Sequence, residues 1–105
     1  FDHSYLDIIF NNLFKNSIEA LENTNNPAID IILKKIDGDL ILTFFDNGPG
    51  YNGDIDDLIK PYFSTKNSSG LGLSLINKII TDNSYKMNIT TNSYSGFKIE
   101  IIFYD

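Results

Sequence analysis

Asp46-Asn47-Gly48-Pro49-Gly50 decides the fold of this chain, together with three other short segments arranged around it in a fixed order. The others are Asn12-Leu13-Phe14-Lys15-Asn16 before it, and Pro61-Tyr62-Phe63-Ser64-Thr65-Lys66 and Gly70-Leu71-Gly72-Leu73 after it. Each segment alone is a weak signal, because an Asp-Asn-Gly run is usually a turn and paired glycines usually punctuate the backbone. Their order and spacing, however, suit the construction of one ligand pocket.

The composition predicts one domain. With 105 residues and 42% hydrophobic content, the chain can bury one modest core. It has no cysteine, which excludes disulfides and thiolate sites, and no apolar run of the roughly 20 residues that a membrane span needs. The net charge of -6 leaves no extended basic face, so we expect no nucleic-acid partner. Because Met87 is the only methionine, we interpret the chain as a piece of a longer protein.

The residues before the quoted stretch predict a helix and a β-hairpin. Apolar residues recur at helical spacing from Ser4 to about Leu21, and residues 23–27 are polar and break the helix. Residues 29–34 then alternate as a strand that we expect to be buried mainly on one face. Asp37-Gly38 is a favoured two-residue turn, and residues 40–45 are apolar enough to form a central strand.

The residues after the quoted stretch predict a long loop, a second helix and a second hairpin. Residues 51–69 show no period, apart from a short helical turn near residues 55–59. The helical period returns just after Gly70, and residues 86–91 and 97–104 alternate as a terminal hairpin. The fold class is therefore α+β: a two-layer α/β sandwich with helices on one face of a mixed, mostly antiparallel sheet.

A polar stripe marks the first helix. Asn12, Asn16 and Glu19 are spaced i, i+4 and i+7, so they share one face of the helix. Such a stripe is usually only the solvated face of an amphipathic helix. Short amides and a carboxylate can nevertheless coordinate a hard cation, which takes oxygen ligands and keeps waters and phosphate oxygens as its other partners.

The quoted stretch could recognise a flat ligand. Asp46 ends an apolar strand, where its carboxylate can accept a hydrogen bond from a ligand amine, although an Asp here could also simply start a turn. Gly48 and Gly50 permit positive φ or a close approach of the ligand to the backbone. Pro49 between them stiffens the loop.

Gly70 and Gly72 precede the second helix, whose free N–H groups and partial positive charge attract anions such as phosphate. Neither common glycine-rich phosphate motif is present. Lys66 could add a point charge to a phosphate, although a lysine there is more often only solvated. His3 is the single histidine and lies near the end of the chain, so we interpret it as structural or incidental.

Taken together, the four segments closely resemble the N, G1, F and G2 boxes of the sensor histidine kinase ATP-binding domain. Residues 12–20 look like the N box, and residues 61–66 look like the F box of nitrogen-regulation-type kinases. The resemblance covers residues 2–103 and implies the Bergerat sandwich of the GHKL superfamily. We therefore expect residues 1–105 to be one histidine kinase-type ATP-binding catalytic domain, without the strand that usually precedes the first helix.

The resemblance also implies the ligands, ATP and Mg²⁺, and their contacts. Asn16 would bind Mg²⁺ between the ATP phosphates, with Asn12 beside the same phosphates and Glu19 along that side of the pocket. Asp46 would accept from the adenine exocyclic amine. Residues 51–69 would be the ATP lid. The remaining implied contacts are Gly48 and Gly50 at the adenine end, and Thr65, Lys66, Gly70, Leu71, Gly72 and Leu73 near the phosphates.

The residue at position 12 bears on whether the reaction is phosphoryl transfer or ATP hydrolysis. ATP-hydrolysing members of the superfamily carry a Glu four residues before the metal-binding Asn, where it acts as general base, and this chain has Asn12 there. An amide cannot accept that proton at neutral pH. The resemblance therefore favours phosphoryl transfer, with Asn12, Asn16 and Lys66 as catalytic residues, over hydrolysis. Ser68 departs from the family pattern, since a glycine is common at that position.

We expect a protein histidine kinase catalytic domain that positions Mg·ATP for γ-phosphoryl transfer to a histidine on a separate helical domain. That helical dimerisation and phosphoacceptor domain would belong to the parent chain, and a response regulator would act downstream. The fragment itself would be monomeric and cytoplasmic, whether or not its parent is anchored in a membrane. The alternatives are a catalytically silent nucleotide-binding or interaction module of the same fold, and a true ATPase.

Overall fold

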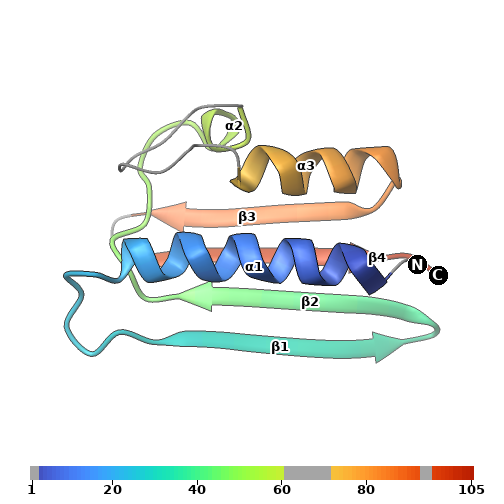
Figure 1. The fold of residues 1–105 in the computed structure, drawn as a ribbon, viewed down its shortest axis with the longest axis horizontal. Coiled ribbons are helices and arrows are strands. Elements are labelled where there is room, and N and C mark those ends of the chain that lie inside the picture. The colour runs from blue at the N-terminus through green and yellow to red at the C-terminus, as the bar shows by residue number, and fades with distance from the viewer. Residues whose placement is uncertain (1–2, 61–71, 93–95) are drawn as a thin grey trace.

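Two β-hairpins form one four-stranded sheet, and two helices pack against it (Figure 1). The computed structural model describes residues 3–60, 72–92 and 96–105. Its elements, in chain order, are α1 (His3–Ala20), β1 (Ile29–Ile36), β2 (Asp39–Asp46), α2 (Ile55–Leu58), α3 (Gly72–Asp82), β3 (Lys86–Asn92) and β4 (Gly96–Phe103). The helices and strands therefore occur in the order that the sequence pattern predicts, with ends that differ from the prediction by one or two residues.

The sheet has the strand order β1-β2-β4-β3, and its three pairings are all antiparallel. The prediction of a mixed sheet is therefore wrong for the strands that the structure describes. β1 with β2 and β3 with β4 are hairpins, which are antiparallel by construction. α3 carries the chain back along the sheet, so β3 runs in the same direction as β2 (Figure 1), but β4 lies between them and runs in the opposite direction.

One hydrophobic core lies between the sheet and the helices. Burial alternates from residue to residue along β2 and along β4. Their inward-facing residues, such as Leu42, Phe44 and Ile101, are fully buried. Ile9 and Leu13 of α1 pack into the same cluster. The other fully or nearly fully buried members are Ile76, Ile79 and Ile80 of α3, Ile89 of β3, and Ile99 and Phe103 of β4. The helices thus cover one face of the sheet, as predicted.

β1 is the exception, because it is an edge strand with exposed apolar side chains on both faces. By register, Ile31 and Leu33 face the same side as Phe44 and Leu42, yet they are 40% and 51% exposed. Ile32 on the opposite face is 50% exposed. The prediction that this strand is buried mainly on one face is therefore wrong. α1 lies over β2 and β4 and leaves β1 at the rim (Figure 1).

Glycine and an αL residue make two of the tight connections possible. Asp37 and Gly38 both have positive φ, at 52° and 88°, which is the geometry of a two-residue hairpin turn between twisted strands. Gly96, with φ 77°, begins β4 directly beside the backbone of Asp46. A side chain at residue 96 would collide with the Asp46 carbonyl, so only glycine lets β4 start there.

Candidate functional site

The predicted site residues of the described segments gather at the end of the sheet where β2 ends. α1 ends at Ala20 and β2 ends at Asp46 on the same side of the molecule, and α3 begins on this side (Figure 1). The loop of residues 47–50 leaves β2 at this point. Three elements that lie far apart in the sequence therefore meet here.

Asp46 is held in the interior by two hydrogen bonds. Its side chain is 3% exposed, and that of Ser17 on α1 is 2% exposed. The Ser17 hydroxyl donates to Asp46 Oδ2 over 2.7 Å, and the Gly48 backbone N–H donates to Asp46 Oδ1 over 3.0 Å. A buried carboxylate is stable only with such partners. The two bonds connect α1, β2 and the following loop at a single group.

Residue 48 has too little room for a side chain. A Cβ at residue 48 would lie 3.0 Å from Asp46 Oδ1 and 3.4 Å from the Ala20 carbonyl oxygen. These contacts are tighter than a real side chain normally makes, so the loop lies directly against the end of α1 because residue 48 is glycine. Gly50, two residues on, has φ 67° and turns the chain away from the site. The predicted positive φ is therefore present at Gly50, and the close approach of a ligand to these glycines stays a prediction.

Asn12 and Asn16 lie beside the first residue of α3. A Cβ on Gly72 would be 3.2 Å from Asn12 Oδ1 and 3.2 Å from Asn16 Nδ2, so both amides face this helix start. The Asn12 amide also donates from Nδ2 to the Ile8 carbonyl oxygen over 2.7 Å, which directs its oxygen away from α1. The fold therefore brings together two amides from the first segment and a glycine from the fourth.

The start of α3 adds backbone donors to this group of side chains. α3 is an 11-residue helix that begins at Gly72, and the first N–H groups of a helix lack intrahelical acceptors. Leu73 is half-buried and packs against the core, so at the site it can contribute only its backbone. Glu19 is half-buried one turn beyond Asn16 on α1. Thr65, Lys66, Gly70 and Leu71 lie outside the described residues.

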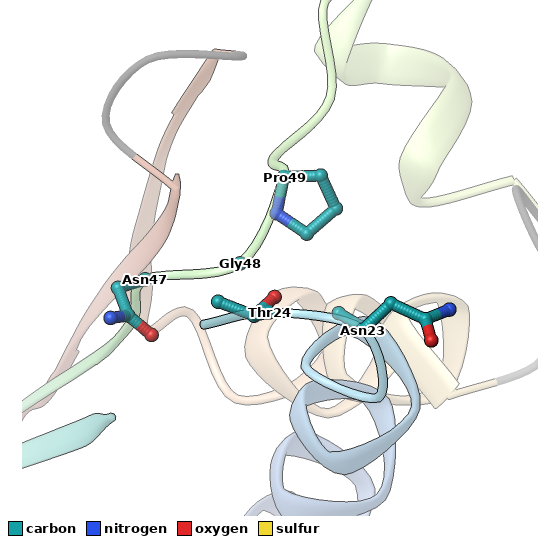
Figure 2. A pocket seen from close by; sticks show the side chains of 6 residues that line it. Asn23, Thr24, Asn47, Gly48 and Pro49 are labelled. Atoms are coloured by element: carbon teal, nitrogen blue, oxygen red, sulfur yellow. The ribbon is translucent and has the colours of Figure 1, made fainter. Parts of the chain in front are cut away.

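A hollow of about 370 Å³ opens next to the Gly48 loop (Figure 2). Gly48 and Pro49 form one side, and Asn23 and Thr24, which follow α1, form the other. Ala20 and Asn47 complete the lining. Gly48, whose N–H donates to the buried Asp46 carboxylate, connects the hollow to that group.

Asn47 fixes the loop that forms the far wall of this hollow. Its Nδ2 donates to the Asn26 carbonyl oxygen over 3.0 Å, and its Oδ1 accepts from the Ala28 N–H over 2.8 Å. The Asn47 N–H donates in turn to the Ala28 carbonyl oxygen over 3.2 Å. One side chain thus ties residues 26–28 to the end of β2, a role that its place in the Asp46–Gly50 stretch does not indicate.

Ser17 is a second site residue that the sequence pattern did not indicate. It lies between Leu13 and Leu21 on the buried stripe of α1, where the helical spacing predicts an apolar position. A usable signal was present, because a polar residue at a buried helical position needs a hydrogen-bond partner. The sequence could not identify that partner, which is 29 residues away.

The segment after Gly50 is tied to β3 at its start and makes local contacts as far as residue 60. The Tyr51 N–H donates to Thr91 Oγ1 over 2.9 Å, which ties it to β3. Asp54 caps α2 by accepting from the Asp56 N–H over 3.0 Å. At its end, the hydrogen bond between Lys60 and Asp57 raises the pKa of the Lys60 ammonium, and the nearby carboxylate charges add to this effect. These contacts belong to residues 51–60 of the predicted lid, and its residues 61–69 lie outside the described residues.

The described residues offer oxygen and backbone ligands rather than an acidic metal cage. Within residues 3–60, 72–92 and 96–105, no three His, Cys, Asp or Glu side chains are grouped as a metal site. The amide oxygens of Asn12 and Asn16 fit a cation that takes most of its ligands from phosphates and water. Separately, none of the helices in these ranges is long and apolar enough to span a bilayer.

Comparison with known proteins agrees with this arrangement. The family described as histidine kinase-, DNA gyrase B- and HSP90-like ATPase matches residues 1–104. The sensory histidine kinase/phosphatase NtrB of Rhizobium leguminosarum bv. phaseoli is 37% identical over 108 residues, which cover 87% of this chain and 28% of that protein. The C4-dicarboxylate transport sensor protein DctB of Rhizobium meliloti (strain 1021) is 33% identical over 79 residues, which cover 73% of this chain and 13% of that protein.

Solved structures share the fold. The catalytic domain of histidine kinase ThkA, in a nucleotide-free form, is 27% identical with a TM-score of 0.79, and the match covers 97% of this chain and 67% of that one. The mycobacterial sensor histidine kinase MprB superposes with a TM-score of 0.78 at 21% identity, over 98% of this chain and 72% of that one. The chain spans less than a third of the length of the two curated relatives named above.

Proposed function

This chain belongs to the histidine kinase-, DNA gyrase B- and HSP90-like ATPase family, and on that premise we propose that it positions Mg·ATP for γ-phosphoryl transfer to a histidine. It is an ATP-binding catalytic domain of the sensor histidine kinase type. The acceptor histidine would lie on a helical dimerisation and phosphoacceptor domain of the parent chain, and a response regulator would take the phosphoryl group onward. We place this domain, as a monomer by itself, in the cytoplasm.

The observation that carries the proposal is the meeting of Asn12, Asn16 and Gly72. Two amides stand at the N-terminus of α3, where the free N–H groups and the helix dipole favour phosphate. Asn16 would hold Mg²⁺ through its Oδ1, and Asn12 would contact the phosphates. When bound, Mg²⁺ neutralises the charge on the phosphate oxygens. Lys66 and the backbone of Gly70 and Leu71 would complete this group.

Asp46 would accept from the exocyclic amine of adenine. Each oxygen of an ionised carboxylate has two lone pairs, and one on each oxygen is used by Ser17 or Gly48. The remaining lone pairs can accept from a ligand amine. The hollow that Gly48 lines would give the base room to approach.

Asn12 supports transfer rather than hydrolysis. Its side chain is neutral and already donates to the Ile8 carbonyl oxygen, so it cannot take a proton from water. Phosphoryl transfer needs chiefly alignment and charge stabilisation, which amides and backbone donors provide. The reaction would then wait until the acceptor histidine is brought to the γ-phosphate.

The test is a titration of the chain with Mg·ATP by calorimetry, followed by a transfer assay with the helical domain of the parent protein. We expect saturable binding that weakens when EDTA removes Mg²⁺, and a phosphorylated histidine on the helical domain. Binding without transfer would favour the silent nucleotide-binding module. Steady phosphate release by the chain alone would favour an ATPase and would contradict the role given to Asn12.

We also propose that one more strand precedes α1 in the parent protein and pairs with β1. No strand among the described residues pairs with the outer edge of β1, and Ile31, Ile32 and Leu33 are 40–51% exposed on its two faces. α1 begins at the end of the sheet where β1 ends (Figure 1), so a strand leading into α1 could run beside β1. A chain extended upstream should slow amide hydrogen exchange in β1. Unchanged amide hydrogen exchange in β1 would contradict the proposed pairing.

A further inference from the structure

Ser17 and Asp46 are the two buried polar side chains among the described residues, and they are bonded to each other. Their exposed fractions are 2% and 3%, and the Ser17 Oγ to Asp46 Oδ2 distance is 2.7 Å. Leu13 and Leu21, one turn away on either side of Ser17, are also buried. Ser17 therefore lies on the buried face of α1, and its hydroxyl donates to the Asp46 carboxylate.

This arrangement determines where the hydroxyl proton lies. A serine hydroxyl has one proton, and an ionised carboxylate only accepts, so the proton points at Oδ2. The other oxygen, Oδ1, is held by the Gly48 N–H at 3.0 Å. With one donor on each oxygen, the Asp46 carboxylate cannot rotate freely. Its remaining lone pairs point in fixed directions.

From this geometry we infer that Ser17 is a positioning residue that makes the site select a 6-aminopurine over a 6-oxopurine. The inference rests on the proposed nucleotide function. A 6-amino group donates to the fixed lone pairs of Asp46, whereas a 6-oxo group would bring its own lone pairs against them. While Ser17 holds Oδ2, the carboxylate cannot turn to relieve that repulsion. Without the hydroxyl, Asp46 gains freedom and the discrimination falls.

Three substitutions of Ser17 separate the hydroxyl from the space that the side chain fills. Ser17→Ala removes the hydroxyl. Ser17→Thr and Ser17→Val add nearly the same bulk, but only Thr keeps a hydroxyl that can donate to Asp46. The comparison between Thr and Val therefore isolates the hydrogen bond, even if added bulk at this buried position lowers the stability of both variants.

The measurement is the ratio of the dissociation constants for Mg·ITP and Mg·ATP, obtained by calorimetry at one temperature. ITP carries a 6-oxo group in place of the 6-amino group of ATP. We expect Ser17→Ala and Ser17→Val to lower this ratio by about tenfold. That is the change in affinity expected for the loss of one hydrogen bond to a charged group. Ser17→Thr should keep a ratio near that of the wild type.

A purely structural role for Ser17 predicts a different pattern. Loosening α1 from β2 would weaken ATP and ITP binding alike, so an unchanged ratio in Ser17→Ala and Ser17→Val would overturn the inference while leaving the proposed function intact. Equal loss of selectivity in Ser17→Thr and Ser17→Val would overturn it as well. If the wild-type chain binds neither nucleotide, the proposed function itself fails, and that result is visible before any variant is made.

Discussion

The two halves of the candidate site are built differently, although both depend on neighbouring residues of α1. In the half around Asp46, Ser17 and Gly48 bond both carboxylate oxygens, and the group is almost fully buried. In the half around Gly72, the Asn12 and Asn16 amides are half-exposed beside the start of α3. The first half is part of the core, whereas the second lies at its surface.

The difference shows which part of the site depends on folding alone. The Asp46 half is formed by contacts that also hold α1, β2 and the following loop together, so its geometry should exist before any ligand binds. The amides at Gly72 contribute little to the core, so they remain available for a cation and for phosphates. Substitutions beside Gly72 should therefore change binding without changing stability, whereas substitution of Asp46 should change both.

The largest difference should come from Asn16→Asp. A carboxylate at this position adds a negative charge beside the triphosphate, and we expect Mg·ATP binding to weaken by about a hundredfold. Because Asn16 is half-exposed, the free energy of unfolding should change by less than about 1 kcal/mol. Calorimetry and urea unfolding measure the two effects.

Asn11→Asp is the matched control for this variant. Asn11 is the exposed neighbour on the same helix, so the substitution adds the same charge without touching Gly72. Its Mg·ATP affinity should stay close to that of the wild type. Equal losses in both variants would mean that the net charge of α1, rather than the Asn16 amide, governs binding.

Asp46→Asn should lower stability and binding together. The amide that replaces the carboxylate turns one of its two acceptors into a donor, so either Ser17 or Gly48 loses its acceptor. We expect the free energy of unfolding to fall by about 1–3 kcal/mol, and the affinity for Mg·ATP to fall by about tenfold or more. Urea unfolding and calorimetry report the two changes.

Asp37→Asn serves as the control for Asp46→Asn. It removes the same charge at the hairpin turn, at the far end of the sheet, where φ is 52° and Asn is well tolerated. Both measured quantities should stay near their wild-type values. Unchanged affinity of Asp46→Asn for Mg·ATP would show that this carboxylate does not recognise the base.

Gly72→Ala should act on binding alone, and less strongly. The added Cβ would lie 3.2 Å from Asn12 Oδ1 and from Asn16 Nδ2, and displacing the amides should weaken Mg·ATP binding about fivefold. Alanine is a better helix former than glycine, so the free energy of unfolding should not fall. Thr81→Ala, exposed at the other end of α3, is the control. A loss of stability without a loss of affinity would contradict the placement of Gly72.

The smallest effect should come from Lys60→Gln, which lies outside both halves. The hydrogen bond with Asp57 raises the pKa of the Lys60 ammonium, so this pair favours the folded state below the usual pKa of lysine and ceases to do so as the pH rises through the raised value. The pair is exposed, and we expect no measurable shift of the urea midpoint at pH 7. A clear shift would show that α2 stabilises the domain more than its contacts indicate.

Local patterns predicted most of the fold. The period of α1, the Asp37-Gly38 turn and the alternation in β2 and β4 depend on neighbours in the sequence, and the structure confirms them. The exposure of β1 was not predictable in this way. Its apolar residues resemble those of a buried strand, but burial depends on whether a helix covers the strand, and α1 covers β2 and β4 instead (Figure 1).

The candidate site also contains residues that the sequence indicated and one that it did not. The sequence alone identified Asn12, Asn16, Asp46, Gly48 and Gly72, because amides, carboxylates and glycines occur there in a recognisable order. It did not identify Ser17, which looks like one more position on the core stripe of α1. Only the packing of α1 on β2 shows that its hydroxyl meets Asp46.

The sequence by itself therefore determined the elements, the single core and the residue types of the candidate site, since periodicity and turn chemistry are local properties. Tertiary structure decided which strand lies at the edge, which amides meet the start of α3, and which hydroxyl holds the buried carboxylate. These are contacts between residues far apart in the chain. Their physical basis is the need to pair each buried polar group, and only the folded packing shows which partner meets it.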